Sequence, residues 1–106
     1  MRYDDIKVGH RGTYTRTITE ELNKRFADVI GDYNPVHFDE ARMKKSIFGK
    51  CATNGFLTES TIAVALVEMF TSKESIIIAL KKEVTLLAPV FMGDTVTAIV
   101  TVDERI

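Results

Sequence analysis

One stretch of the sequence decides the fold: residues 26–57 read FADVIGDYNPVHFDEARMKKSIFGKCATNGFL. At its centre, Asp32 and His37 lie on one short loop that also contains Pro35. Pro35 fixes its own φ and keeps Asn34 out of helical geometry, so this loop is stiffer than most. A carboxylate and an imidazole held close together can share one water molecule, because one group accepts a proton while the other delivers one. The loop is therefore a candidate catalytic site.

A helix is predicted before this loop, between Thr19 and Gly31. Thr19 is a suitable N-cap, and Gly31 can adopt the left-handed conformation that ends a helix. Three apolar residues between them, Leu22, Phe26 and Ile30, are each four positions apart and so lie on one face of a helix. Ala27 and Val29 lie beside this face. The candidate loop therefore begins at a defined helix end.

Two further helices are predicted after the loop. Asp39 is a suitable N-cap for a short helix over roughly residues 40–45. Phe48 and Gly49 mark a turn, and Gly55 opens a helix that runs to about Phe70. Residues 62–67 of this last helix are apolar without a break, so we expect it to be buried on all sides.

The remaining segments favour β-structure. Residues 12–18 alternate threonine with other side chains, and residues 95–102 alternate valine or alanine with mostly threonine. Residues 75–88 are also β-like, and Gly93–Asp94 is a turn signal. The sequence therefore predicts an α+β domain in which a sheet surrounds one buried helix.

The composition excludes several classes of protein. A chain of 106 residues has room for a single domain, which we place at residues 1–106. Fourteen basic and 15 acidic residues give a net charge of -1, so nothing favours nucleic acid or an anionic membrane as partner. Cys51 is the only cysteine, which excludes an internal disulfide and favours a cytoplasmic setting. The N-terminus lacks the apolar stretch of a signal peptide, and residues 61–70 are too few to span a bilayer.

Residues 26–57 resemble the MaoC-like dehydratases, the (R)-specific enoyl-CoA hydratases of the hotdog fold. The matching residues follow the family's order: Phe26-Ala27, Gly31-Asp32, Asn34-Pro35, His37, Phe48-Gly49 and Gly55. Residues 88–96 also resemble the family's strand-turn-strand junction. The resemblance implies a hotdog fold, with an antiparallel sheet wrapped around a long central helix. It also implies two further strands after residues 95–102, which this sequence does not contain.

The resemblance implies a hydro-lyase of fatty acid metabolism that adds water to trans-2-enoyl thioesters or removes it from (R)-3-hydroxyacyl thioesters. On this interpretation Asp32 and His37 hold the water and manage the protons, and which of them is the base stays open. The backbone N–H of Gly55 would receive the negative charge that develops on the thioester oxygen. Asn34 would brace the loop. The walls of the acyl site would come from three apolar residues, Phe48, Phe56 and Leu57.

The resemblance further implies an acyl-CoA or acyl-carrier-protein substrate, no cofactor and a homodimer or higher homo-oligomer. A metal site is not expected, since no second histidine or cysteine lies at a familiar ligand spacing from Asp32 and His37. The family usually has histidine where this chain has Asn54. That difference and the missing strands favour one alternative, a non-catalytic subunit that binds acyl thioesters or completes a partner. A thioesterase is a further alternative, because the same fold hosts that activity.

Overall fold

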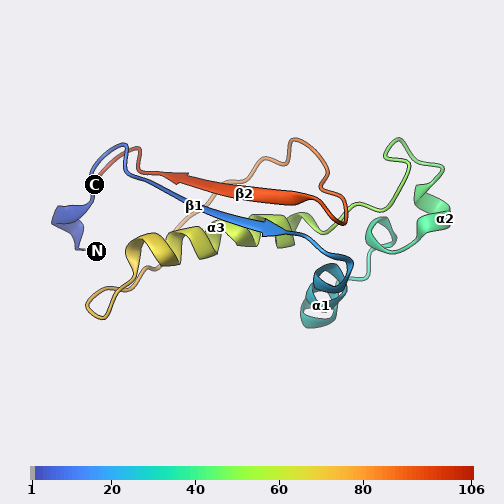
Figure 1. The fold of residues 1–106 in the computed structure, drawn as a ribbon, viewed down its shortest axis with the longest axis horizontal. Helices are drawn as coiled ribbons and strands as arrows, with labels where there is room; N and C mark the ends of the chain where they lie inside the picture. The colour runs from blue at the N-terminus through green and yellow to red at the C-terminus, as the bar shows by residue number, and fades with distance from the viewer. Residues whose placement is uncertain (1) are drawn as a thin grey trace. The chain divides into compact units, whose positions relative to one another are not determined.

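The computed structural model describes residues 2–106, which form helices and a two-stranded sheet (Figure 1). The α-helices are α1 (Glu20–Ile30), α2 (Glu40–Met43) and α3 (Gly55–Phe70). The strands are β1 (Arg11–Thr17) and β2 (Thr95–Thr101), and 3₁₀ helices cover Tyr3–Asp5 and Pro35–His37. β1 and β2 are hydrogen-bonded neighbours. They run antiparallel, because Ile18 after the end of β1 bonds to Asp94 before β2, and Gly9 before β1 bonds to Val102 after the end of β2.

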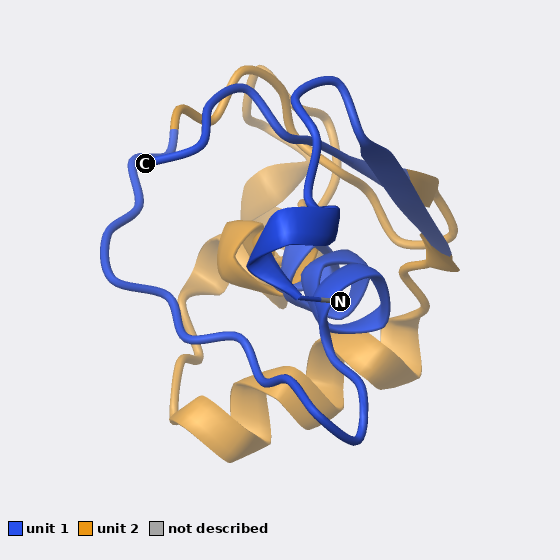
Figure 2. Cartoon of the chain, turned by 90° about the vertical axis from the view of Figure 1, so that its left-hand side faces the viewer, with its two compact units in different colours: residues 1–15, 60–84, 97–106 blue, residues 16–59, 85–96 orange. Residues whose placement is uncertain are grey.

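The chain contacts divide the molecule into two compact units (Figure 2). Unit 1 contains residues 1–15, 60–84 and 97–106, and unit 2 contains residues 16–59 and 85–96. Helix α3 and both strands continue from one unit into the other. The single-domain organisation inferred from the sequence stays a prediction.

Unit 1 joins the outer half of the sheet to the second part of α3. Val102 accepts from the Gly9 N–H at 2.7 Å and donates to the His10 carbonyl at 2.9 Å. Gly12 on β1 lies directly against Met69 of α3, since a Cβ at this glycine would come 2.9 Å from the Met69 sulfur. A side chain at position 12 would therefore require the Met69 side chain to move aside.

Unit 2 contains most of the buried side chains. The Ile18 side chain is fully buried, and its backbone donates to the Asp94 carbonyl and accepts from the Gly93 N–H, both at 2.8 Å. The other buried apolar residues of this unit come from α1, α2, the segment that leads into α3 and the first turn of α3: Ala27, Met43, Cys51, Ala52 and Leu57. This core holds the start of α3 near the loop that follows α1.

The helix boundaries predicted from the sequence are confirmed, except that α2 ends at Met43, two residues before the predicted end. The Thr19 hydroxyl accepts from the Leu22 N–H at 3.1 Å, and Gly31 ends α1 with φ of 78°. Asp39 caps α2 by accepting from the Arg42 N–H at 3.0 Å. Helix α3 begins at Gly55 as predicted. The two strands predicted at residues 12–18 and 95–102 are confirmed to within one residue at each end.

The prediction for residues 75–88 is wrong, because this segment contains no strand. A strand needs a neighbour that completes its ladder of backbone hydrogen bonds. Among residues 2–106 the only strands are β1 and β2, and they pair with each other. The segment therefore has a strand-like sequence but forms no strand in the described part of the chain.

The prediction that α3 is buried on all sides is also wrong. Its buried residues follow a single line at positions 57, 61 and 65, one turn apart. Phe56, Ile62 and Val67 lie off this line and are exposed. On α1, Val29 is 83% exposed, although it was assigned to the apolar face. The two-stranded sheet is too small to cover a helix on every side.

The buried thiol of Cys51 predicts a loss of stability at alkaline pH. Burial, assisted by the Glu40 carboxylate, raises the pKa of this thiol from 9.0 to about 11. The folded chain therefore holds the proton more tightly than the unfolded chain does, and the free energy of unfolding should fall as the pH rises from 9.0 through about 11. Denaturant unfolding of the wild type and of Cys51→Ala at several alkaline pH values measures this effect. Parallel pH dependences of the two proteins would contradict it.

Candidate active site

The loop after α1 is held by the short side chains that it contains. Asp32 accepts from the backbone N–H of Asn34 at 3.1 Å through Oδ1. Asn34 in turn accepts from the N–H of Val36 at 3.2 Å, at the start of the 3₁₀ helix that contains His37. Each of these bonds spans two residues, the geometry in which Asp and Asn replace a backbone turn. The loop is therefore ordered by its own sequence.

His37 is buried, and its ring is oriented by the segment that leads into α3. The ring Nδ1 lies 2.8 Å from the carbonyl oxygen of Ala52. A carbonyl can only accept, so Nδ1 carries a proton, and in the neutral imidazole Nε2 is the nitrogen that can accept one. The geometry assigns the tautomer that a proton acceptor at Nε2 needs.

Asn54 connects Asp32 to the start of α3. Its side-chain amide donates to Asp32 Oδ2 at 2.9 Å, while its side-chain oxygen accepts from the Phe56 N–H at 2.9 Å. Asn54 is thus the N-cap residue of the helix and a partner of the carboxylate at the same time. Sequence reasoning noted Asn54 only as a departure from the family pattern. Because Asn54 directly precedes Gly55, where the helix was predicted to begin, its role as a helix cap could have been predicted from the sequence.

Asn23 is a second buried amide that the sequence reasoning missed. It lies on α1, where its side chain is 1% exposed. Its amide nitrogen is 3.5 Å from the His37 carbonyl oxygen, and its side-chain oxygen accepts from the Asn54 N–H at 3.4 Å. Buried polar groups are costly unless they are hydrogen-bonded, so Asn23 fixes α1 to both parts of the site. A polar residue on the helix face that also carries Ala27 could have indicated this role.

A cavity of about 390 Å³ in unit 2 lies beside these residues. Three of the predicted site residues line it, namely His37, Phe48 and Gly55. The remaining lining is mostly apolar and comes mainly from the end of the 75–88 segment and its continuation: Leu86, Leu87, Ala88, Pro89 and Val90, with Val36, Ala52, Thr53 and Thr58. The structure therefore places the imidazole and the first residue of α3 on one cavity.

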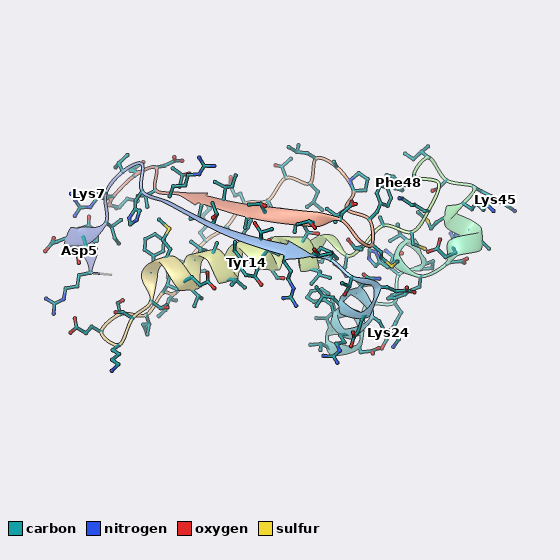
Figure 3. The ribbon with its side chains drawn as sticks, in the orientation of Figure 1. Asp5, Lys7, Tyr14, Lys24, Lys45 and Phe48 are labelled. Carbon is teal, nitrogen blue, oxygen red and sulfur yellow. The ribbon has the colours of Figure 1, made fainter. Side chains whose placement is uncertain are left out.

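The other predicted site residues lie around this cavity without lining it. Asp32 and Asn34 do not line the cavity. Asp32 accepts a hydrogen bond from the side chain of Asn54, and Asn54 directly precedes Gly55, which does line the cavity. Leu57 is 3% exposed and belongs to the core, whereas Phe56 is 66% exposed. Of the three predicted wall residues, only Phe48 lies on the cavity, and Figure 3 shows it in the connection between α2 and α3.

Gly55 presents a backbone donor at the beginning of α3. The first N–H groups of a helix have no partner within it, and Asn54 satisfies that of Phe56. In residues 2–106 no acceptor is found for the N–H of Gly55. A Cβ at this position would come 3.1 Å from Leu86 Cδ1, so a side chain here would crowd the Leu86 side chain that lines the cavity. The arrangement can receive a negatively charged oxygen.

An exposed cluster ties the loop to α1. The Tyr33 hydroxyl donates to Asp28 at 2.7 Å, and Lys24 donates to the two Asp28 oxygens at 2.7 and 2.8 Å (Figure 3 labels Lys24). The bond from Lys24, and then that from Tyr33, lowers the pKa of Asp28, while Asp28 raises the pKa of both partners. The cluster is exposed to solvent, connects the loop to α1 and is absent from the lining of the cavity.

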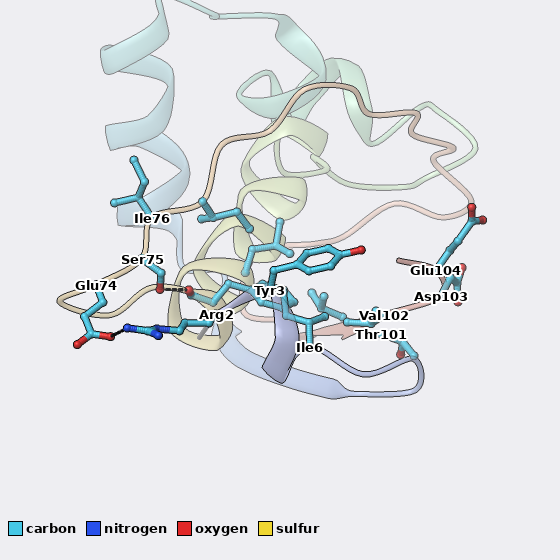
Figure 4. A pocket seen from close by; sticks show the side chains of 14 residues that line it. Arg2, Tyr3, Ile6, Glu74, Ser75, Ile76, Thr101, Val102, Asp103 and Glu104 are labelled. Atoms are coloured by element: carbon cyan, nitrogen blue, oxygen red, sulfur yellow. Dashed lines mark hydrogen bonds and ion pairs between the residues drawn. The ribbon is translucent and has the colours of Figure 1, made fainter. Parts of the chain in front are cut away.

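Other features do not contribute to this site. A cavity of about 850 Å³ lies in unit 1 and contains none of the predicted site residues (Figure 4). Within residues 2–106 no group of three or more histidine, cysteine or acidic side chains is arranged to hold a metal ion. None of the described helices has both the length and the apolar character needed to cross a bilayer.

Comparison with known proteins agrees with this architecture. Residues 6–106 match the family model described as a MaoC like domain. The (R)-specific enoyl-CoA hydratase of Rhodospirillum rubrum is 32% identical over 100 residues, which cover 94% of this chain and 68% of that protein. The unliganded R-hydratase PhaJ1 of Pseudomonas aeruginosa is 30% identical with a TM-score of 0.84, over 98% of this chain and 66% of the other.

A second solved structure, protein af1124 of Archaeoglobus fulgidus, is 30% identical with a TM-score of 0.85. It is covered over 61% of its length by 93% of this chain. This chain therefore spans about two thirds of the length of the relatives that it matches. Its fold is the α+β hotdog fold, as the sequence predicted, and the chain belongs to the family of MaoC-like dehydratase domains.

Proposed function

We propose that this chain hydrates trans-2-enoyl thioesters to (R)-3-hydroxyacyl thioesters and catalyses the reverse dehydration. The observation that carries the proposal is the shared cavity of His37 and Gly55, with Asp32 held beside it by Asn54. A proton-transfer group and a backbone donor for an oxyanion thus meet at one apolar space. The relatives named as (R)-specific hydratases support this assignment at the level of the family.

In the proposed reaction, His37 and Asp32 position one water molecule. The oxygen of this water bonds to the β-carbon, one group accepts the proton that the water loses, and the other delivers a proton to the α-carbon. The hydrogen bond from Nδ1 to Ala52 leaves Nε2 available for one of these transfers. Asp32 accepts from the Asn34 N–H and from the Asn54 side chain, and these two bonds would fix the orientation of its carboxylate towards the water.

Negative charge develops on the thioester oxygen while the new bond forms. The N–H of Gly55 would donate to this oxygen, and the N-terminus of α3 adds its positive dipole. Glycine suits this position because the carbonyl of a substrate can approach the main chain closely. No metal or redox cofactor enters the proposed reaction.

The acyl chain would lie in the 390 Å³ cavity against Phe48, Leu86 and Val90. We propose an acyl-CoA or acyl-carrier-protein thioester as substrate, a cytoplasmic location and a homodimer as the working assembly. Phe56 and Leu57 do not line this cavity. Their assignment as walls of the acyl site stays a prediction.

The activity is tested by the loss of enoyl-thioester absorbance when the purified protein is mixed with crotonyl-CoA. His37→Ala and Asp32→Asn should each lower kcat at least about 100-fold, because each removes one proton-transfer group. His10→Ala and Asp103→Asn are matched controls, since His10 is the chain's other histidine and Asp103 is an exposed carboxylate. Full activity in either site variant would eliminate the site.

The same experiment separates the two alternatives from the proposal. An inactive wild type that nevertheless binds acyl-CoA would identify a non-catalytic subunit, which the replacement of the usual histidine by Asn54 favours. Release of free CoA thiol from an acyl-CoA would identify a thioesterase. Hydration that the wild type performs and both site variants lose supports the proposed enzyme.

Asn54 predicts a shift in the pH dependence of the reaction. Asn54→Asp preserves an oxygen that can cap α3 but replaces the donor to Asp32 by a second carboxylate. Repulsion between the carboxylates raises the pKa of Asp32, so the acid limb of the kcat/KM profile should move to higher pH. Asn54→Ser, which keeps both a cap and a donor, is the matched control. An acid limb unmoved in Asn54→Asp would contradict the positioning role of Asn54.

A further inference from the structure

Tyr33 lies within the Asp32–His37 loop, directly after the carboxylate of the candidate site. Its hydroxyl donates to Asp28 Oδ1 at 2.7 Å, and Asp28 is a residue of α1. Lys24, one turn earlier on the same helix, donates to both Asp28 oxygens at 2.7 and 2.8 Å. Asp28 is therefore held by Lys24 in a position where its carboxylate accepts from Tyr33.

The ring of Tyr33 contacts the other end of the same loop. It lies against the Phe38 ring, with the two centroids 6.2 Å apart and an angle of 44° between the planes. This separation is within the range of favourable aromatic pairs, about 4.5–7 Å. Phe38 in turn meets the His37 imidazole edge-on, with centroids 6.3 Å apart and planes at 90°. Tyr33 is thus bonded to Asp32 along the chain and connected to His37 through one ring.

Packing alone does not hold this loop against α1. A cavity of about 450 Å³ in unit 2 is lined in part by Asn23 and Lys24 of α1 and by His37 and Phe38. Side chains that line a cavity lose the contacts that packed neighbours would supply. The position of the loop relative to α1 therefore depends on specific bonds.

Two side-chain hydrogen bonds join the loop to α1 within residues 2–106. One runs from the Asn23 amide to the His37 carbonyl, and at 3.5 Å it is long for a hydrogen bond. The other is the bond from Tyr33 to Asp28, whose 2.7 Å is typical of a hydroxyl that donates to a charged carboxylate. Tyr33 therefore supplies the stronger of the two attachments.

Both partners of this bond have the required protonation state at neutral pH. The bond from Lys24, and then that from Tyr33, lowers the pKa of Asp28 from 3.8, so the carboxylate is charged. The same bond to Asp28 raises the pKa of Tyr33 from 10.0, so the hydroxyl keeps its proton. The donor and the acceptor are therefore both present under the conditions of an activity assay.

We propose that Tyr33 is a positioning residue of the candidate active site, whose hydroxyl and ring together fix the separation between the Asp32 carboxylate and the His37 imidazole. One water molecule must contact both groups in the proposed reaction, so displacing either group lowers the rate. Exposed ion pairs contribute little to stability, so losing this attachment should change turnover much more than unfolding. The inference rests on the proposed function, but the order of the loop is also measurable without substrate, so each can fail separately.

Turnover of crotonyl-CoA tests the inference. Tyr33→Phe removes the hydroxyl and keeps the ring, so kcat should fall about 10-fold, a smaller loss than that expected when a proton-transfer group is removed. KM should change by less than about two-fold, because Tyr33 does not line the acyl cavity. Tyr3→Phe is the matched control, since Tyr3 is also an exposed tyrosine and its hydroxyl donates to the Ile106 carbonyl at 2.9 Å. Equal kcat values for Tyr33→Phe and Tyr3→Phe would overturn the proposal.

Variants of Asp28 separate the effect of the hydrogen bond from that of the charge. Asp28→Ala removes the acceptor, so its kcat should match that of Tyr33→Phe, and the double variant should be no slower than either. Asp28→Asn keeps an oxygen that can accept from Tyr33 and should retain most of the wild-type kcat. Additive losses in the double variant would overturn the proposal, because the two side chains would then act independently.

Amide hydrogen exchange measures the order of the loop without substrate. The N–H groups of Asn34 and Val36 donate to side chains of the loop at 3.1 and 3.2 Å. In Tyr33→Phe these two amides should exchange faster than in Tyr3→Phe, since a loop that has lost an attachment opens more often. Unchanged exchange would overturn the inference even in an active hydratase. Faster exchange in a chain whose wild type is inactive would contradict the proposed function and still support the positioning role of Tyr33.

Discussion

The arrangement of the candidate site depends on one buried amide, the side chain of Asn54. Its oxygen caps α3 and its nitrogen holds Asp32, so the beginning of the helix and the carboxylate are fixed by the same planar group. Removing an N-cap costs about 1 kcal/mol, and leaving a buried hydrogen-bonding group unsatisfied costs about 1–3 kcal/mol. The loss of this amide would therefore disturb the helix and the loop together. The same residue thus caps the helix and positions the carboxylate of the candidate site.

Asn23 and the Ala52 carbonyl extend this connection to His37. Asn23 contacts the His37 carbonyl and the Asn54 N–H from α1, while Ala52 orients the ring. Three segments that are distant in the sequence are thus fixed by hydrogen bonds between buried groups. A group held in this way needs little reorganisation when charge moves, so these bonds would favour the proposed reaction.

The distribution of apolar residues gives the chain a second constraint. Among the described residues, α3 buries a single line at positions 57, 61 and 65, and all of residues 76–88 except the half-buried Ile77 are exposed. Leu86 belongs to this exposed segment and also lines the cavity, where it lies beside Gly55.

The helix ends could be read from adjacent residues: Thr19, Gly31, Asp39 and Gly55 mark them because capping depends on side chains within three or four residues. The sequence also identified the Asp32–His37 loop and the fold, through a motif carried by adjacent residues. The contacts of Asn54 and Asn23, the position of Phe56 and Leu57 outside the cavity lining and the absence of a strand in residues 75–88 became visible only in the three-dimensional structure. Such features depend on contacts between residues far apart in the chain, and periodicity within one segment does not specify its neighbour.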